Sequence, residues 1–300
     1  MTGLGNLIRR NIRLFFKDKG MFFSSLITPI ILLVLYITFL ANVYRDSFAS
    51  AVPQGITIDD KLLDGIVAGQ LVSSLLAVSC VTVAFCSNLL MINDKVNGAI
   101  RDLTVSPIRR SALALGYFIS SAISTLIISF SALAVGLIYI YTQGWYMSLG
   151  DVLYLILDVF LLTLFGTALS SCVNFSLTTN GQASAVGTIV SAGYGFLCGA
   201  YMPMSQFGNG LQKALLFLPG TYGTSLIRNH AMAGTFREME KIGFPKEPIN
   251  GMLKAVDCRL FFFEHEVEIP TMYLVLAASI VVLIVLYILL NKFFSRRTNE

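Results

Sequence analysis

The residue best placed to do unusual chemistry in this chain is Asp158, the one acidic side chain well inside a long apolar segment. Burying a carboxylate in such a segment is costly, so it is by default a functional site. Asp158 also lies about two helical turns after Asp151, near the end of its segment, where it could face water or a helix partner. The sequence leaves both interpretations open, a protonation role and a structural contact.

Other signatures of catalysis are missing from the sequence. His230 and His265 lie outside the apolar segments and lack metal-ligand spacing, so we predict no metal site. The chain has neither the H-E-x-x-H pair of metalloproteases nor the G-x-x-x-x-G-K-[ST] phosphate loop of many ATPases. We therefore expect no catalytic residues and no cofactor bound by this chain itself.

The cysteines form no C-x-x-C pair. Cys80, Cys86 and Cys172 fall in apolar segments, where a thiol usually serves packing. Cys198 and Cys258 could lie on the same outer side, and whether they form a disulfide is left open.

Long apolar segments must position all of these residues. The chain of 300 residues is 55% hydrophobic and 13% charged, against about 25% charged in a typical soluble domain. Roughly 20 apolar residues cross a bilayer as a helix, which satisfies its own backbone hydrogen bonds there. We predict an all-α polytopic membrane protein with a single domain over residues 1–300. Its six expected transmembrane helices cover residues 22–41, 66–92, 111–141, 152–173, 183–200 and 269–290.

Basic residues flank these spans unevenly. The termini and the second-to-third connection share one side, and they carry Arg9, Arg10, Arg13, Lys17, Lys19, Lys95, Arg101, Arg109, Arg110, Lys292, Arg296 and Arg297. The first connection on the other side has only Arg45 and Lys61. Since short cytoplasmic connections are rich in Lys and Arg, we place both termini in the cytoplasm. The net charge of +4 sits beside the spans, so it does not indicate nucleic-acid binding.

Two cytoplasmic segments have patterns of their own. In residues 1–20, apolar side chains such as Leu7 and Phe15 share one helical face and the cations share the other. We expect this amphipathic interfacial helix to lie in the headgroup layer with its cations toward lipid phosphates, as an anchor or as a lever on the first span. Residues 93–110 mix charges with apolar side chains, as in a short helix offered to a soluble partner or in a solvated basic loop. Composition alone favours the loop.

This connection nevertheless resembles the coupling segment of type-2 ABC-transporter permeases, the exporter membrane subunits with an ABCG-like fold. The family has a charged cluster, a Gly, a Leu, and a Pro followed three residues later by Arg or Lys. The cluster is normally Glu-Arg-Glu, whereas here it is Asn93-Asp94-Lys95. The resemblance implies that a cytoplasmic coupling segment over 93–110 contacts an ATPase through Asn97, Gly98, Ala99, Ile100, Arg101, Asp102, Leu103, Pro107 and Arg110.

A second match to the family follows the fifth expected span. The stretch from Gly199 to Pro203 resembles a Gly-x-x-x-Pro exit, and a Pro-x-x-Tyr motif with a downstream Arg comes after it. The resemblance implies re-entrant outer helices between spans five and six, with a small extracellular cap, over residues 201–268. Backbone is tolerated at membrane depth where protein buries it. The residues assigned to this region by resemblance are Pro203, Pro219, Tyr222 and Arg228.

Small residues recur every four positions in the fifth expected span, as Ala183, Gly187, Ser191, Gly195 and Gly199. Such a stripe lets helices approach closely in lipid, either within one subunit or across a dimer. By resemblance, the second and fifth spans of paired subunits border a translocation path. The candidates for that path are Phe85, Asn88, Asp158, Tyr194 and Phe196.

The resemblance implies the membrane subunit of an ATP-driven exporter, in a bacterial plasma membrane. ATP and Mg would bind on separate ABC ATPase subunits, and a second permease, identical or different, would complete the path among membrane lipids. The expected substrate is an amphipathic small molecule, drug or lipid-like compound, moved outward by alternating access. A secondary transporter and a non-transport membrane scaffold are the alternatives. A secondary transporter would usually show several polar groups at midplane and often an internal repeat.

Overall fold

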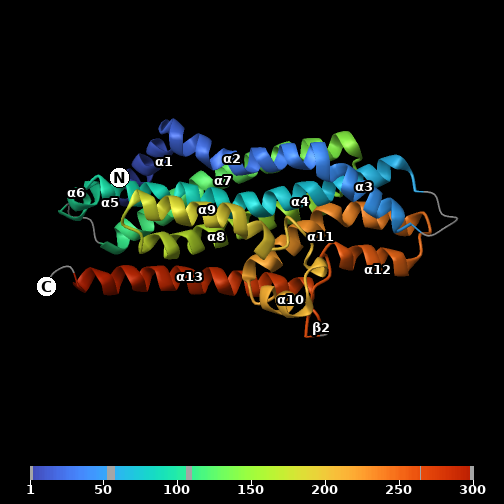
Figure 1. The fold of residues 1–300 in the computed structure, drawn as a ribbon. Coiled ribbons are helices and arrows are strands. Elements are labelled where there is room, and N and C mark those ends of the chain that lie inside the picture. The colour runs from blue at the N-terminus through green and yellow to red at the C-terminus, as the bar shows by residue number, and fades with distance from the viewer. Residues whose placement is uncertain (1–2, 53–57, 106–109, 264, 298–300) are drawn as a thin grey trace.

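A computed structural model describes residues 3–52, 58–105, 110–263 and 265–297, which are almost entirely helical. The long helices lie side by side in an elongated bundle (Figure 1). Both ends of the chain lie at the same end of this bundle as two short helices, α5 (Leu89–Val96) and α6 (Ala99–Val105) (Figure 1).

The elements follow one another with short connections. Before and after the α5–α6 hairpin, the first half of the chain forms α1 (Gly3–Lys17), α2 (Lys19–Leu35), the π-helix η1 (Tyr36–Leu40), α3 (Ala41–Ser50), α4 (Asp60–Ser87) and α7 (Arg110–Gln143). The second half forms α8 (Leu149–Phe175), α9 (Asn180–Leu197), the 3-10 helix η2 (Met204–Gln206), α10 (Asn209–Leu215), α11 (Pro219–Lys241), α12 (Lys246–Ala255), β1 (Phe261–Phe262), β2 (His265–Glu266) and α13 (Ile269–Arg297). The two strands pair antiparallel, with Phe261 opposite Glu266.

Side-chain caps explain where three of the long helices begin. The Asp18 carboxylate accepts from the backbone N–H of Met21 at the start of α2. Ser148 and Asp151 form a capping box at the start of α8, and Thr179 caps α9. These side chains satisfy backbone N–H groups that have no partner within the first helical turn.

Within the described residues, five helical segments are long and apolar enough to cross a membrane: Lys19–Ser50, Asp60–Val96, Ser111–Gln143, Leu149–Phe175 and Ile269–Lys292. They confirm a multi-pass, all-α membrane protein. Helix α9 occupies the position of the predicted fifth span, but its polar first turn and many small residues make it less apolar than the other five. The count of six spans therefore stays a prediction.

Helix α4 is the centre of the bundle. It packs against α2, α7, α8 and α11, and 89% of its most apolar stretch is buried. Small residues bring its neighbours close: a Cβ placed at Gly166 of α8 would lie 2.9 Å from the backbone oxygen of Cys80. A Cβ at Gly69 would likewise lie 2.9 Å from Met232 of α11. A helix buried on all sides needs no polar face, which accounts for the absence of an amphipathic pattern in α4.

Helix α1 is the predicted amphipathic helix, and it packs along α7. Leu7 and Phe15 are buried, as is the polar Asn11, whose amide donates to Ser120 Oγ at 3.3 Å. A Cβ at Gly116 of α7 would lie 2.4 Å from Leu7, so glycine permits this close approach. The interfacial position of α1 remains a prediction, and not all of its cations point toward lipid, because Arg10 turns inward to an acidic partner.

The segment 201–268 is only partly as expected. Helix α10 is short, whereas α11 has 23 residues and packs against α4, α8 and α13. The length of α11 is therefore a finding of the structure. Its glycines and hydroxyl side chains fit closely against neighbouring helices, as at Gly223 beside Leu162, so the helix is buried despite low hydropathy. Re-entry of this region into a membrane stays a prediction.

Candidate functional site

The predicted coupling segment forms a helical hairpin. Helix α4 ends at Ser87, α5 continues from Leu89, and α6 turns back after Gly98. Gly98 has a φ of +78°, a left-handed conformation that glycine adopts without strain. Since nothing lies within 4 Å of a Cβ placed there, backbone conformation rather than space requires this glycine.

Asp94 joins the hairpin to two other helices. Arg10 of α1 donates to both carboxylate oxygens of Asp94, at 2.7 and 3.0 Å, and the Tyr117 hydroxyl of α7 donates to Asp94 Oδ2 at 2.5 Å. Asp94 is buried, while Arg10 is partly exposed. The hydrogen bond to Asp94 raises the pKa of Arg10 above its ordinary value, so the guanidinium stays charged. A bidentate pair of this kind fixes orientation as well as distance.

Lys95, the next residue, contacts the other side of the bundle. Its ammonium group donates to the carbonyl oxygens of Phe175 and Leu177, at 2.5 and 2.9 Å, and lies 5.3 Å from the centre of the Phe175 ring. These carbonyls are at the C-terminus of α8, where the helix dipole favours a cation. The cluster Asn93-Asp94-Lys95 differs from the family's Glu-Arg-Glu, but it keeps one acidic and one basic residue. Each of these two residues has a defined partner.

Helix α6 packs against α5 and presents its outer side to solvent. Asn97, Arg101 and Asp102 are exposed, and Val105 is 88% exposed. Ala99, Ile100 and Leu103 are half-buried. Pro107 lies outside the described residues, and Arg110 is described only as the first residue of α7. The hairpin thus offers a small, mixed apolar and charged surface at the end of the bundle.

Phe85 and Asn88, proposed for a translocation path, lie inside the subunit. The Asn88 amide donates to Ser170 and Ser171 at 2.5 and 3.0 Å, and its oxygen accepts from Ser121 at 2.9 Å. Phe85 is buried as well. Their side chains therefore tie α4 to its neighbours in this conformation rather than facing an open surface.

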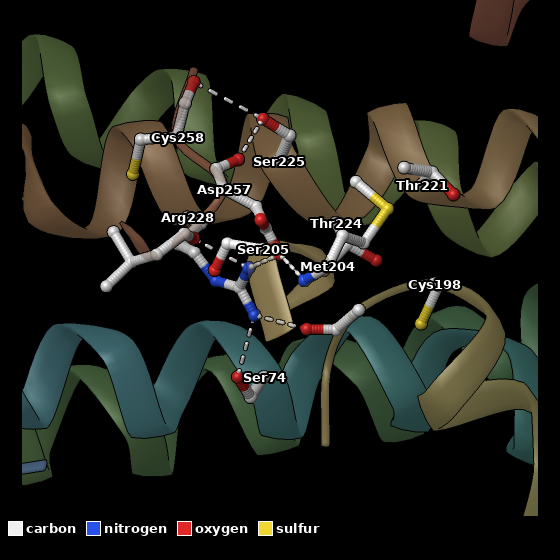
Figure 2. Close-up of polar contacts among 12 residues, drawn as sticks. Ser74, Cys198, Met204, Ser205, Thr221, Thr224, Ser225, Arg228, Asp257 and Cys258 are labelled. Atoms are coloured by element: carbon white, nitrogen blue, oxygen red, sulfur yellow. Dashed lines mark hydrogen bonds and ion pairs between the residues drawn. The ribbon is translucent and has the colours of Figure 1, made fainter. Parts of the chain in front are cut away.

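Arg228 of α11 is the centre of a second polar cluster (Figure 2). Its guanidinium donates to the carbonyl oxygens of Val256 and Gly199, at 2.7 and 2.9 Å, and to Ser74 Oγ at 3.2 Å. Asp257 Oδ2 lies 3.3 Å from Arg228 Nη1. One wholly buried side chain thereby connects α4, α11, the end of α9 and the segment after α12 (Figure 2).

The backbone around this cluster has a specific conformation. Gly199 and Asp257 have φ values of +74° and 56°. Asp257 Oδ2 accepts from the backbone N–H of Met204 at 2.7 Å, just after Pro203. The left-handed turn gives a physical reason for glycine at the start of the Gly-x-x-x-Pro match.

The second match, Pro-x-x-Tyr, lies at the start of α11. Pro219 is its first residue, where a missing N–H costs nothing. The Tyr222 hydroxyl donates to the Leu216 carbonyl oxygen at 2.7 Å, which holds the preceding turn.

Asp158 and His230 were each considered alone in the sequence, and the structure brings them together. His230 Nδ1 lies 2.6 Å from Asp158 Oδ2, and the Tyr273 hydroxyl donates to Asp158 Oδ1 at 2.5 Å. Asp158 is wholly buried, so its position favours a helix partner over a water-facing site. Asp151 forms an ion pair with Arg237 on the same two helices, α8 and α11.

The small residues of α9 serve different contacts. A Cβ at Gly195 would lie 2.4 Å from the Tyr201 ring, and the Tyr201 hydroxyl donates to the Ser191 carbonyl oxygen at 3.0 Å. Ala183 is buried, whereas nothing lies within 4 Å of a Cβ at Gly187. The stripe therefore packs within the subunit at its C-terminal half and is open at Gly187.

The remaining two path candidates lie on this helix. Tyr194 is buried, and Phe196 is exposed. All five cysteines lie in the described ranges and are free thiols, so Cys198 and Cys258 are not paired in this structure.

Sequence reasoning missed Arg10 and Tyr117 as partners of Asp94, and Tyr273 as a partner of Asp158. Arg10 and Asp94 are separated by 84 positions. The only available signal was an unpaired acidic residue at the end of an apolar segment, which predicts some cationic partner without identifying it.

A comparison with protein families gives one match. The family model for ABC-2 type transporters matches residues 2–231, from α1 through most of α11, and this range includes the α5–α6 hairpin and both matched motifs. No curated protein matches the chain.

Proposed function

Because the chain belongs to the ABC-2 type transporter family and is thus a membrane subunit of an ABC transporter, we propose that it is an exporter permease driven by separate ATPase subunits. The observation that carries the proposal is the α5–α6 hairpin. It presents an exposed helix at one end of the bundle, while the two charged residues just before its turn contact α1, α7 and α8.

The hairpin is built to transmit a displacement. An ATPase dimer that closes on ATP would move α6, its contact surface. Asp94 would carry this motion to α1 and α7, because Arg10 and Tyr117 are bonded to the same carboxylate. Lys95 would carry it to α8 through the carbonyls at the end of that helix. Tilting of these helices would alternate access between the two sides, and hydrolysis would reset it.

The rest of the assembly follows from exposed surfaces and from the family. Ile189 and Phe196 leave an apolar face of α9 uncovered, which supports a second permease, identical or different, packed there. Tyr194 and Phe196 would then border the path, and Phe85 and Asn88 would join it only after α4 moves. An amphipathic small molecule or lipid-like compound, moved outward, suits a path lined by aromatic and amide groups.

The test is association with a candidate ATPase in detergent, followed by measurement of its ATP turnover. Val105→Arg places a charge on the most exposed apolar residue of α6 without disturbing a buried contact. We expect this variant to lose ATPase association. Ile242→Arg, an equally drastic change at an exposed position at the end of α11, is the control and should associate normally.

Normal association and turnover of the Val105→Arg complex would contradict the coupling role of the hairpin. A secondary transporter or a membrane scaffold would then be the better explanation for these spans. Loss of association in the Ile242→Arg variant as well would point to general misfolding and not to a specific contact.

A further inference from the structure

An apolar groove runs between α9 and α13, and its floor is α8. Its volume is about 550 Å³, within the range of small-molecule sites. Phe165 of α8 lies in the floor, Leu197 of α9 lines one wall, and Val275 of α13 lines the other. The first residues of α11, from Pro219, close one end. The walls come from helices that lie along the bundle on either side of α8 (Figure 1).

The groove is shaped for a hydrocarbon chain. Its lining runs along α13 from Leu274 to Leu283, about 13 Å at 1.5 Å per residue. It opens sideways from the bundle, since Leu274 is 68% exposed and Val282 is 64% exposed. The lining surface is almost wholly apolar, and α8 and α13 are segments long and apolar enough to cross a membrane. Lipid therefore surrounds the opening, and an acyl chain is the group that lipid supplies.

A cationic and aromatic surface lies beside the Leu218 end of this groove. Lys213, Asn209 and Gln212 of α10 line a small polar hollow. Among the described residues, Lys213 forms no ion pair, and its ammonium group lies 5.5 Å from the centre of the Phe263 ring. Phe217, between the two sites in sequence, is 65% exposed and packs against Phe263. Aromatic rings with a neighbouring cation are typical of the headgroup level of a membrane.

Tyr194 adds a polar group to the groove. It is more than nine-tenths buried, and its hydroxyl has no hydrogen-bond partner in the described part of the chain. The hydroxyl lies beside Gly220, in the first turn of α11, where the Thr221 N–H donates to the Leu218 carbonyl oxygen but the Gly220 N–H precedes the first helical acceptor. A pure hydrocarbon would leave the Tyr194 hydroxyl and the Gly220 N–H unsatisfied, whereas an ester carbonyl oxygen could accept from them.

We propose that this groove is a binding site for one glycerophospholipid of the leaflet opposite the α5–α6 hairpin. One acyl chain fills the groove, an ester carbonyl lies near Tyr194 and Gly220, and the phosphate lies at Lys213. The site is separate from the ATPase contact, and of the path candidates it includes only Tyr194. It requires only that the chain is in a membrane, so it can fail or hold independently of the exporter proposal.

The test uses the full-length chain in phosphatidylcholine nanodiscs that contain phosphatidylglycerol with a photoactivatable diazirine in one acyl chain. Crosslinked peptides are identified by mass spectrometry, and diacylglycerol with the same labelled chain is the probe without a phosphate. Ala278→Trp fills the groove, and Ala277→Trp, at the adjacent exposed position outside the lining, is its control. Lys213→Gln removes the phosphate partner, and Lys246→Gln, at an exposed position at the start of α12, is its control.

We expect crosslinks concentrated in the α9 and α13 residues of the groove, lost in Ala278→Trp and retained in Ala277→Trp. Lys213→Gln should lower groove labelling by phosphatidylglycerol about fivefold, with no change for diacylglycerol or in Lys246→Gln. If Ala278→Trp is not folded, Leu274→Trp at the exposed mouth of the groove takes its place. Labelling spread evenly over all lipid-facing helices, or equal labelling of the groove by both probes, would each overturn the proposal.

Discussion

Two of the charged clusters that join helices of this bundle are built differently. At Arg228, the cation is wholly buried and bonded to two backbone carbonyls, a serine and a carboxylate. At Asp94, the partners are side chains only, and Arg10 is partly exposed. Backbone partners cannot leave without local unfolding, whereas side chains can exchange partners or take up water. The Arg228 cluster therefore fixes the fold, and the Asp94 cluster is suited to movement.

The largest effect is expected from Arg228→Met. This change leaves Asp257 buried without its cation and two carbonyl oxygens without a donor, so it should destabilise the protein by about 3–5 kcal/mol. Thermal unfolding in detergent measures the loss. Arg259→Met, which breaks the exposed pair with Glu266, is the control and should change stability little. An equal decrease in melting temperature for both variants would show that the buried pair contributes no more to stability than the exposed pair.

A smaller effect on stability is expected from Arg10→Gln. Asp94 keeps Tyr117 as a donor, so the loss should be about 1.5–3 kcal/mol, at the lower end because Arg10 is partly exposed. If the Asp94 cluster transmits movement, this variant should still bind an ATPase but lose substrate-stimulated turnover. Arg9→Gln, at the exposed neighbouring position, should retain both. Full stimulation in Arg10→Gln would show that α1 is not part of the transmission.

Gly98→Ala tests the turn between α5 and α6. A left-handed φ of +78° costs a residue with a Cβ about 1–2 kcal/mol, although space is available there. Hydrogen exchange of α5 and α6 should report the loosened turn while the rest of the bundle stays protected. Gly193→Ala, in open space within α9, should be neutral or slightly stabilising. Equal behaviour of the two variants would mean that the turn does not depend on Gly98.

The smallest effect is expected at Cys258, which adjoins the Arg228 cluster. Burial raises the pKa of this thiol to about 12, so at mildly alkaline pH it should stay protonated and resist alkylation. Mass spectrometry of iodoacetamide-treated protein measures the modification, and denatured protein is the positive control. The Arg228→Met variant should expose Cys258 and make it react. Fast labelling of the folded, unaltered chain would mean that the cluster opens readily.

Local patterns predicted most of the helices and few of their contacts. The uncharged stretch at 111–141 became α7, and the two-faced pattern of residues 1–20 became α1, because hydropathy and helical periodicity are properties of neighbouring residues. The length of α11 was missed because its small and hydroxyl side chains are buried by close packing. Its Arg228 bonds to Ser74, 154 positions away, and no local pattern identifies such a partner. A coupling segment over residues 93–110 was predicted by resemblance, whereas the helical hairpin there and its connections through Asp94 and Lys95 needed the structure.

The two acidic residues of α8 set the register between this helix and α11. Asp151 and Asp158 are seven residues apart, and their partners Arg237 and His230 are seven apart in the reverse direction. Sliding one helix by seven residues, about 10 Å, would bring Asp158 to Arg237 but leave Asp151 without a partner. Because intermediate positions satisfy neither carboxylate, the helices must shift together. Lys95 binds the opposite end of α8. This helix therefore has defined contacts at both of its ends, and a displacement at one face of the membrane moves the other end as well.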